Sequence, residues 1–144
     1  MRTAPRIIGL LAVFLGVLAC ASGRAEAATV TVRNDSDTDI LMVFMFHDTG
    51  RNYFYVRGWY RVPAGKRLYW DFDIASDKNF YWYGRAVSGK DRRWPSTGQR
   101  KQAIVDKTMD LKYDEVREQP GAYDVEFAVR QPDREGNISI NLVN

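Results

Sequence analysis

The chain of 144 residues is poor in the side chains that most often carry catalysis. Cys20 is its only cysteine and His47 is its only histidine. Nucleophilic catalysis needs a nucleophile, a base and a group that orients the base, and no Gly-x-Ser-x-Gly turn is present to expose a serine. We therefore expect no catalytic residues, with His47 at a strand end or in the core.

A metal-binding pattern begins in the sequence but is not completed. Asp35, Asp37 and Asp39 have the spacing that opens a calcium loop. The sixth position of that loop is Ile40 instead of glycine, and the twelfth is Phe46 instead of glutamate. We predict an aspartate-rich turn, no metal site and no cofactor.

No apolar run is long enough to cross a bilayer. The run from Ile7 to Ala19 falls short of the roughly 20 residues that a spanning helix needs. It follows Arg2 and Arg6 and precedes Ala25-Glu26-Ala27, which is typical of a signal peptide. We predict that residues 1–27 are removed and that residues 28–144 form one exported domain, periplasmic or secreted, without a transmembrane span. The alternative is a lipid anchor at Cys20.

The chain also lacks a strong charge of one sign. Its formal net charge is +3, but Arg2, Arg6 and Arg24 lie in the leader together with Glu26. The exported domain would therefore be nearly neutral, and we expect no nucleic-acid partner. The sequence leaves the oligomeric state open.

Sustained helical periodicity is absent, and short runs rich in Val, Ile, Tyr, Phe and Trp recur between turn signals. This pattern predicts an all-β fold, an antiparallel two-sheet sandwich of about eight strands in a single domain. The apolar run Ile40 to Phe46 is expected at its centre, covered on both faces. Residues 88–98 are expected to form a long surface loop, and Asp114 to Gln119 a single helical turn.

Alternation divides the aromatic strands into two faces, because successive side chains of a strand point to opposite sides. Phe54, Val56 and Tyr60 are expected in the core. The same holds for the alternating positions 68–74 and 80–86. The opposite faces combine aromatic side chains with arginines, at Tyr53, Tyr55, Arg57, Trp59, Arg61, Arg67, Tyr69, Tyr81, Tyr83 and Arg85.

This second face has two interpretations. In the first, the face is an open platform that binds a protein or an envelope glycan, since Tyr, Trp and Arg are common binding anchors. In the second, the face is covered by the second sheet or by the loop that carries Trp94, and its residues stabilise the sheet. We favour a non-enzymatic binding domain as the function.

Two other function classes stay open. A secreted toxin or a toxin-neutralising protein is one of them. The other is a small envelope hydrolase, which would need only two nearby carboxylates. The candidates for such a pair are Asp71, Asp73, Asp110, Asp114 and Glu115.

A family resemblance covers roughly residues 30–87. The resemblance rests on three segments: Val32 to Ser36, Arg57-Gly58-Trp59-Tyr60-x-Val62-Pro63-Ala64-Gly65, and Phe80 to Ala86. Together they resemble a bacterial exported domain family of unknown function, which has a Gly-Trp-aromatic strand followed by a Pro-Gly-type turn. The family often has a cysteine pair where this chain has Arg33 and Arg67. The resemblance implies a small extracytoplasmic β domain and no catalytic residues.

Overall fold

The computed structural model describes residues 27–144, and the predictions of a signal peptide and of a lipid anchor at Cys20 lie outside them. This part of the chain consists of ten strands and one 3₁₀ turn. The strands are β1 (Ala28–Asn34), β2 (Ile40–Asp48), β3 (Tyr53–Val62), β4 (Arg67–Phe72), β5 (Phe80–Ala86), β6 (Gly89–Trp94), β7 (Arg100–Ile104), β8 (Met109–Lys112), β9 (Tyr123–Arg130) and β10 (Ile138–Leu142), and the turn is η1 (Glu115–Glu118). The prediction of an all-β fold is confirmed.

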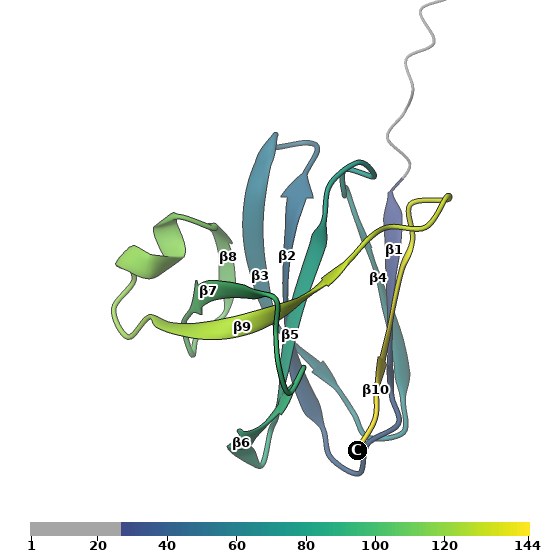
Figure 1. The fold of residues 1–144 in the computed structure, drawn as a ribbon, viewed down its shortest axis with the longest axis vertical. Coiled ribbons are helices and arrows are strands. Elements are labelled where there is room, and N and C mark those ends of the chain that lie inside the picture. The colour runs from purple at the N-terminus through teal and green to yellow at the C-terminus, as the bar shows by residue number, and fades with distance from the viewer. Residues whose placement is uncertain (1–26) are drawn as a thin grey trace, which may run out of the picture.

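The strands form a short sheet and a long sheet. The short sheet has the order β10-β1-β4, and the long sheet has the order β7-β9-β5-β2-β3-β8, with β6 paired to β5. All pairs are antiparallel except β1 with β10. In Figure 1 the short sheet stands at the right, while η1, β7 and β8 lie at the left. The turn η1 contacts β7 and β8, the two ends of the long sheet, so the long sheet curls round on itself.

Two apolar cores result from this arrangement. The first lies between the sheets, where side chains of β1 and β10 meet Phe44 and Phe46 of β2. The second lies inside the curl of the long sheet and includes Val43 and Met45 of β2 together with Val116 of η1. Strand β2 thus supplies both cores with alternate side chains, which confirms its predicted central position.

Several details differ from the sequence-based expectation. The structure has ten strands instead of about eight, and β1 pairs with β10 in parallel. The expected loop at residues 88–98 contains β6, whose Arg93 pairs with Arg85 of β5. The polar side chains of this strand hid its extended conformation in the sequence. The single helical turn after Asp114 is present as η1. Within residues 27–144, no helix combines the length and the apolar character needed to cross a membrane.

Strand β3 contains a β-bulge where it pairs with β2. Met42 pairs with Tyr60 and Val43 pairs with Gly58, so Trp59 has no partner on β2. A glycine is needed at this point because the strands approach closely. A Cβ atom on Gly58 would lie 2.9 Å from Cγ2 of Val43 and 3.1 Å from the carbonyl oxygen of Met42.

The bulge changes which faces the two halves of β3 present. Phe54 and Val56, which precede it, pack against the second core. Trp59 also packs there, while Tyr60 packs against the first core. The expectation that Phe54, Val56 and Tyr60 share one face is therefore wrong, because the extra residue reverses the alternation between them.

Candidate functional site

The predicted aromatic and arginine face is divided among three places. Tyr53, Tyr55 and Arg57 stay together at the surface of β3, each half-buried. Residues of β5 and the second half of β3 lie in or against the second core, and the rest lie apart on other exposed surfaces. A single open platform is therefore not formed.

The group that stays at the surface lies where β8 pairs with β3. Arg57 is opposite Asp110 and Tyr55 is opposite Lys112. We call this region the tyrosine–arginine surface. It comprises Arg51, Tyr53, Tyr55, Arg57, Asp110 and Lys112.

Two aspartates fix the arginines of this surface. Arg51 donates two hydrogen bonds to the carboxylate of Asp110, at 2.9 and 3.0 Å. Arg57 donates from Nε to Asp110 at 2.9 Å and from Nη2 to Asp48 at 2.8 Å. The side chain of Asp48 is only 7% exposed. Its carboxylate accepts hydrogen bonds from Arg57 and from the backbone N–H of Arg51, the latter at 3.0 Å. These bonds hold both guanidinium groups in fixed positions.

The tyrosines of the surface lie beneath cations. The guanidinium carbon of Arg51 is 4.5 Å from the ring centroid of Tyr55, and Nζ of Lys112 is 5.5 Å from that of Tyr53. The hydroxyl of Tyr53 donates to Asp114 at 2.9 Å. Each ring thus has a positive charge above it and an ordered orientation.

Hydrogen bonds shift the pKa values of two groups of this surface further from pH 7. Hydrogen bonds from Arg51 lower the pKa of Asp110, and the bond to Asp114 raises the pKa of Tyr53. The carboxylate is therefore ionised and the phenol neutral. Neither group is poised to exchange a proton near pH 7.

A depression of about 350 Å³ adjoins this surface. Its lining includes Tyr113, whose ring stacks on Tyr53 at 5.8 Å, and Asp114, the acceptor of the Tyr53 hydroxyl. The lining residues are Arg100, Lys101, Gln102, Tyr113, Asp114 and Arg117. Three of the six are cationic, so the depression extends the tyrosine–arginine surface with a polar, mainly positive region.

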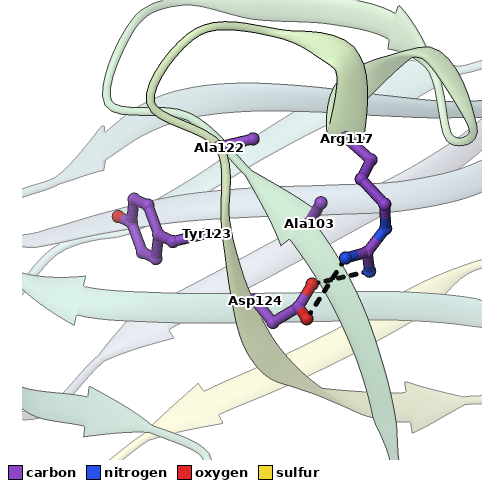
Figure 2. Close-up of a pocket in the computed structure, with 5 residues that line it drawn as sticks. All are labelled: Ala103, Arg117, Ala122, Tyr123 and Asp124. Carbon is purple, nitrogen blue, oxygen red and sulfur yellow. Dashed lines mark hydrogen bonds and ion pairs between the residues drawn. The ribbon is translucent and has the colours of Figure 1, made fainter.

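A smaller pocket of about 100 Å³ lies between β7, η1 and β9 (Figure 2). Arg117 and Asp124 face each other across it, and their ion pair has N···O distances of 2.7 and 3.3 Å. The ring of Tyr123 points away from this pair. Because the two charges neutralise each other, the pocket offers little to a charged ligand.

The interior group of predicted residues forms a hydrogen-bonded network at the second core. The guanidinium of Arg85 lies 4.3 Å from the ring of Trp59 and donates to Asp106 at 2.8 Å and to the Tyr123 hydroxyl at 2.9 Å. Tyr123 donates to Asp106 at 2.6 Å, and Trp59 Nε1 donates to the carbonyl of Val105 at 2.9 Å. The network joins β3, β5, β9 and the segment before β8, and it closes the second core.

The predicted residues of β5 beside this network are buried. Tyr81, Tyr83 and Arg85 are 7%, 4% and 9% exposed. Burial raises the pKa of Tyr83 and of Tyr123, and the hydrogen bond to Asp106 raises that of Tyr123 further. These residues are covered, but not by the second sheet or by the loop that carries Trp94. The covering elements are β7, β9 and η1, whereas Trp94 packs against the first core.

The remaining predicted residues lie apart. Arg61 is exposed and donates to Asp39 at 2.8 Å. Tyr69 and Arg67 lie on β4, in the short sheet, and Tyr69 is 73% exposed. Alternation alone placed them with the residues of β3 because it does not indicate which sheet a strand joins.

Sequence reasoning missed Arg51, Asp48 and Lys112. Arg51 belongs to the turn between β2 and β3, and Lys112 reaches Tyr53 only through the pairing of β8 with β3. The one available signal was an arginine two residues before an aromatic strand. The register of β8 could not be derived from the sequence.

The aspartates with calcium-loop spacing do not converge in the structure. Asp35 accepts from Arg33, Asp37 from Arg92, and Asp39 from Arg61 and the backbone N–H of Ala64. Across residues 27–144, no group of three or more His, Cys, Asp or Glu side chains is arranged to hold a metal ion. His47 packs edge-on against Phe54, and its buried Nδ1 has no hydrogen-bond partner.

No family model, curated protein or solved structure matches the chain.

Proposed function

We propose that the protein is an extracytoplasmic, non-enzymatic domain that binds a protein partner through the tyrosine–arginine surface. The observation that carries this proposal is the pair of half-buried tyrosines on β3, Tyr53 and Tyr55, each held beneath a cation and next to a positive depression. Tyrosine and arginine are over-represented among the anchors of protein interfaces.

Preorganisation supports binding at this surface. Asp110 and Asp48 already fix the guanidinium groups of Arg51 and Arg57. A partner would therefore meet arginines that lose little conformational freedom on binding, which reduces the entropy cost of association. The aspartates also leave the surface near neutrality, so we expect recognition by ring contacts and hydrogen bonds more than by long-range attraction.

The chemistry of the surface favours a protein over an envelope glycan. Sugar rings stack on open aromatic faces. Here Arg51 covers Tyr55 on one face and Lys112 lies over Tyr53. Peptide carbonyls and carboxylates, in contrast, suit the N–H groups of the Arg51 guanidinium that its two bonds to Asp110 leave over.

The carboxylates support a non-enzymatic function over a hydrolase. Asp48 and Asp110 both accept hydrogen bonds from Arg57, and the pKa of Asp110 is lowered. A glycosidase needs one carboxylic acid whose pKa is raised, so that it can donate a proton. Asp110, one of the candidate carboxylates, has the opposite character.

The location and the architecture complete the proposal. The signal-peptide pattern of the first 27 residues supports export. We interpret the described domain as a two-sheet sandwich in which the larger sheet curls to enclose a second core. The resulting rigid β3–β8 pair presents the tyrosine–arginine surface.

Site-specific photo-crosslinking tests the proposal. A benzoylphenylalanine at Tyr55 of the full chain, in the cells that produce it, should crosslink to one protein species. The same probe at Arg134, which is exposed in the turn between β9 and β10, serves as the control. Adding Arg51→Glu should remove the crosslink at position 55. The substitution breaks the ion pair with Asp110 and replaces the positive charge over the ring at position 55 with a negative one.

Two outcomes would contradict the proposal. Equal crosslinks at positions 55 and 134 would mean that the surface has no special role, and an absence of crosslinks at 55 would mean that no protein partner is bound there. A single tight partner that proves to be a secreted toxin would specify the function as neutralisation.

A further inference from the structure

Strand β4 ends the short sheet, and its outer edge is unpaired. Within the described residues, β4 pairs only with β1. The long sheet reaches this edge only beyond the end of β4, where the N–H of Thr49 donates to the carbonyl of Asp73 at 2.8 Å. Along β4 itself, β3 packs face to face with the strand through contacts such as Tyr60 with Trp70, at 5.3 Å. An unpaired edge presents free N–H and C=O groups that can pair with another strand.

The pairing of β1 and β4 determines which groups face outward. The N–H of Asn34 donates to the carbonyl of Lys66 at 2.9 Å, so the backbone of Lys66 faces β1. In an antiparallel pair this orientation alternates along the strand. The register continues without a shift to Phe72. The backbone groups of Arg67, Tyr69 and Asp71 therefore face the free edge.

The side chains of the same three residues lie on the exposed face of the short sheet. Tyr69 is 73% exposed, more than any other large apolar side chain of the described residues. Arg67 is exposed and takes part in no ion pair among residues 27–144. Asp71 accepts one hydrogen bond, from Thr29, at 2.7 Å. The edge is thus positive at one end, aromatic in the middle and negative at the other end.

We propose that β4 pairs with β4 of a second copy of this chain, antiparallel and centred on Tyr69. Antiparallel self-pairing reverses the order of the charges, so Arg67 lies opposite Asp71 of the second copy, and Asp71 lies opposite its Arg67. The two Tyr69 side chains form the central cross-strand pair. Opposite charges and aromatic pairs at directly opposed positions stabilise a sheet.

The inner face of β4 agrees with this register. Leu68 and Trp70 are half-buried, and each would lie opposite the other residue of the second copy. Trp70 contacts Tyr60 of β3. Tyr60 lies outside the part of β3 that pairs with β8, which runs from Tyr55 to Gly58. The two-fold arrangement joins the short sheets into one sheet of six strands and uses up both β4 edges, so the assembly closes as a dimer.

This dimer uses Arg67, Tyr69 and Asp71, none of which belongs to the tyrosine–arginine surface, although Arg57 of that surface lies 5.8 Å from the ring of Phe72 at the end of β4. The dimer does not depend on the proposed function. An interface of two short strands is small, so we expect a weak dimer that forms with increasing concentration. Sedimentation equilibrium of the full chain, exported with its own leader and then purified, measures it.

Charge reversal tests the register. Arg67→Asp and Asp71→Arg each place like charges at both outer pairs of a homodimer, and each should weaken dimerisation by about tenfold. Mixing the two variants places an aspartate opposite an arginine at both pairs, so the mixture should form a heterodimer. The double variant Arg67→Asp/Asp71→Arg should dimerise like the original chain. Asp73→Arg, a neighbouring charge change outside these pairs, serves as the control.

Proline substitution tests the backbone pairing. Tyr69→Pro removes an N–H that faces the free edge and leaves the bonds to β1 intact. The variant should keep its circular dichroism spectrum and lose the dimer. If it unfolds, the mixed charge variants still provide the test.

Three results would overturn the proposal. The chain could be monomeric at millimolar concentration. It could dimerise equally well with all the charge variants, which would place the interface elsewhere. Finally, the Arg67→Asp and Asp71→Arg variants could fail to form a heterodimer when they are mixed, which would rule out the proposed register.

Discussion

The two halves of β3 contain the same kinds of residue but differ in environment. Before the bulge, Tyr55 and Arg57 lie at the surface, where Arg51 and Asp110 hold them in place. After it, Trp59 packs against the second core beneath Arg85, and Tyr60 packs against the first core. One extra residue separates a candidate binding surface from a structural strand.

The comparison shows that composition does not determine the role of an aromatic and arginine cluster. An arginine covers an aromatic ring in both halves, at 4.5 Å for Arg51 on Tyr55 and at 4.3 Å for Arg85 on Trp59. The difference lies in what covers the pair. Elements β7, β9 and η1 enclose the second pair, while the first stays open to solvent.

Removing the large ring from each half should give the largest contrast in stability. Trp59→Ala removes packing in the second core, leaves the carbonyl of Val105 without its donor and uncovers the guanidinium of Arg85. We expect a loss of about 3 kcal/mol in the free energy of unfolding. Tyr55→Ala should cost less than about 1 kcal/mol, because the ring is half-buried and lies at the surface. Urea denaturation measures both, and equal losses would mean that the halves do not differ.

The bulge itself provides the second test. In Gly58→Ala the new Cβ would lie 2.9 Å from Cγ2 of Val43 and 3.1 Å from the carbonyl oxygen of Met42. Overpacking of this kind costs about 2 kcal/mol. Gly89→Ala is the matched control, because nothing lies within 4 Å of its Cβ position. Denaturation midpoints that move equally in the two variants would show that the close approach at Gly58 is unimportant.

Much of the fold follows from the sequence where alternation and turn signals agree. The alternating run from Tyr123 to Arg130 is β9 with the same bounds, and its inward Val125 and Phe127 are buried. The continuous apolar run of β2 correctly indicated a strand covered on both faces. Strand β9 has one covered face and alternates, whereas β2 is covered on both faces and is apolar throughout, so in both cases the local pattern matches the packing.

The candidate site could be predicted only in part. The alternation of Tyr53, Tyr55 and Arg57 was readable, because it precedes the bulge. The burial of Tyr83 and Arg85 could not be predicted, since it depends on β7 and β9 curling over them. Once covered, Arg85 donates hydrogen bonds to Asp106 and Tyr123. The position of Trp59 was equally hidden, because a bulge is a property of the pairing with β2 and leaves no mark on the alternation of β3 itself.

Acid titration should give the smallest difference between the two halves of β3. Asp110 holds Arg57 in the first half, and its pKa is lowered chiefly by hydrogen bonds from Arg51. Asp39 holds Arg61 in the second half, and its pKa is lowered chiefly by the backbone N–H of Ala64. For both carboxyls the unfolded pKa is about 3.9. The stability that they contribute is thus present above about pH 4 and is lost as the pH falls through the lower folded value.

The two aspartates allow this loss to be assigned. Asp110→Asn and Asp39→Asn should each reduce the difference in Tm between pH 7 and pH 3, because an amide does not titrate. Both carboxylates are partly exposed and screened by solvent, so each change should be small. Asp73→Asn, at an exposed residue next to β4, is the control. If only Asp39→Asn reduced it, the ion pairs that Asp110 makes with Arg51 and Arg57 would add nothing measurable to the stability of the fold at pH 7.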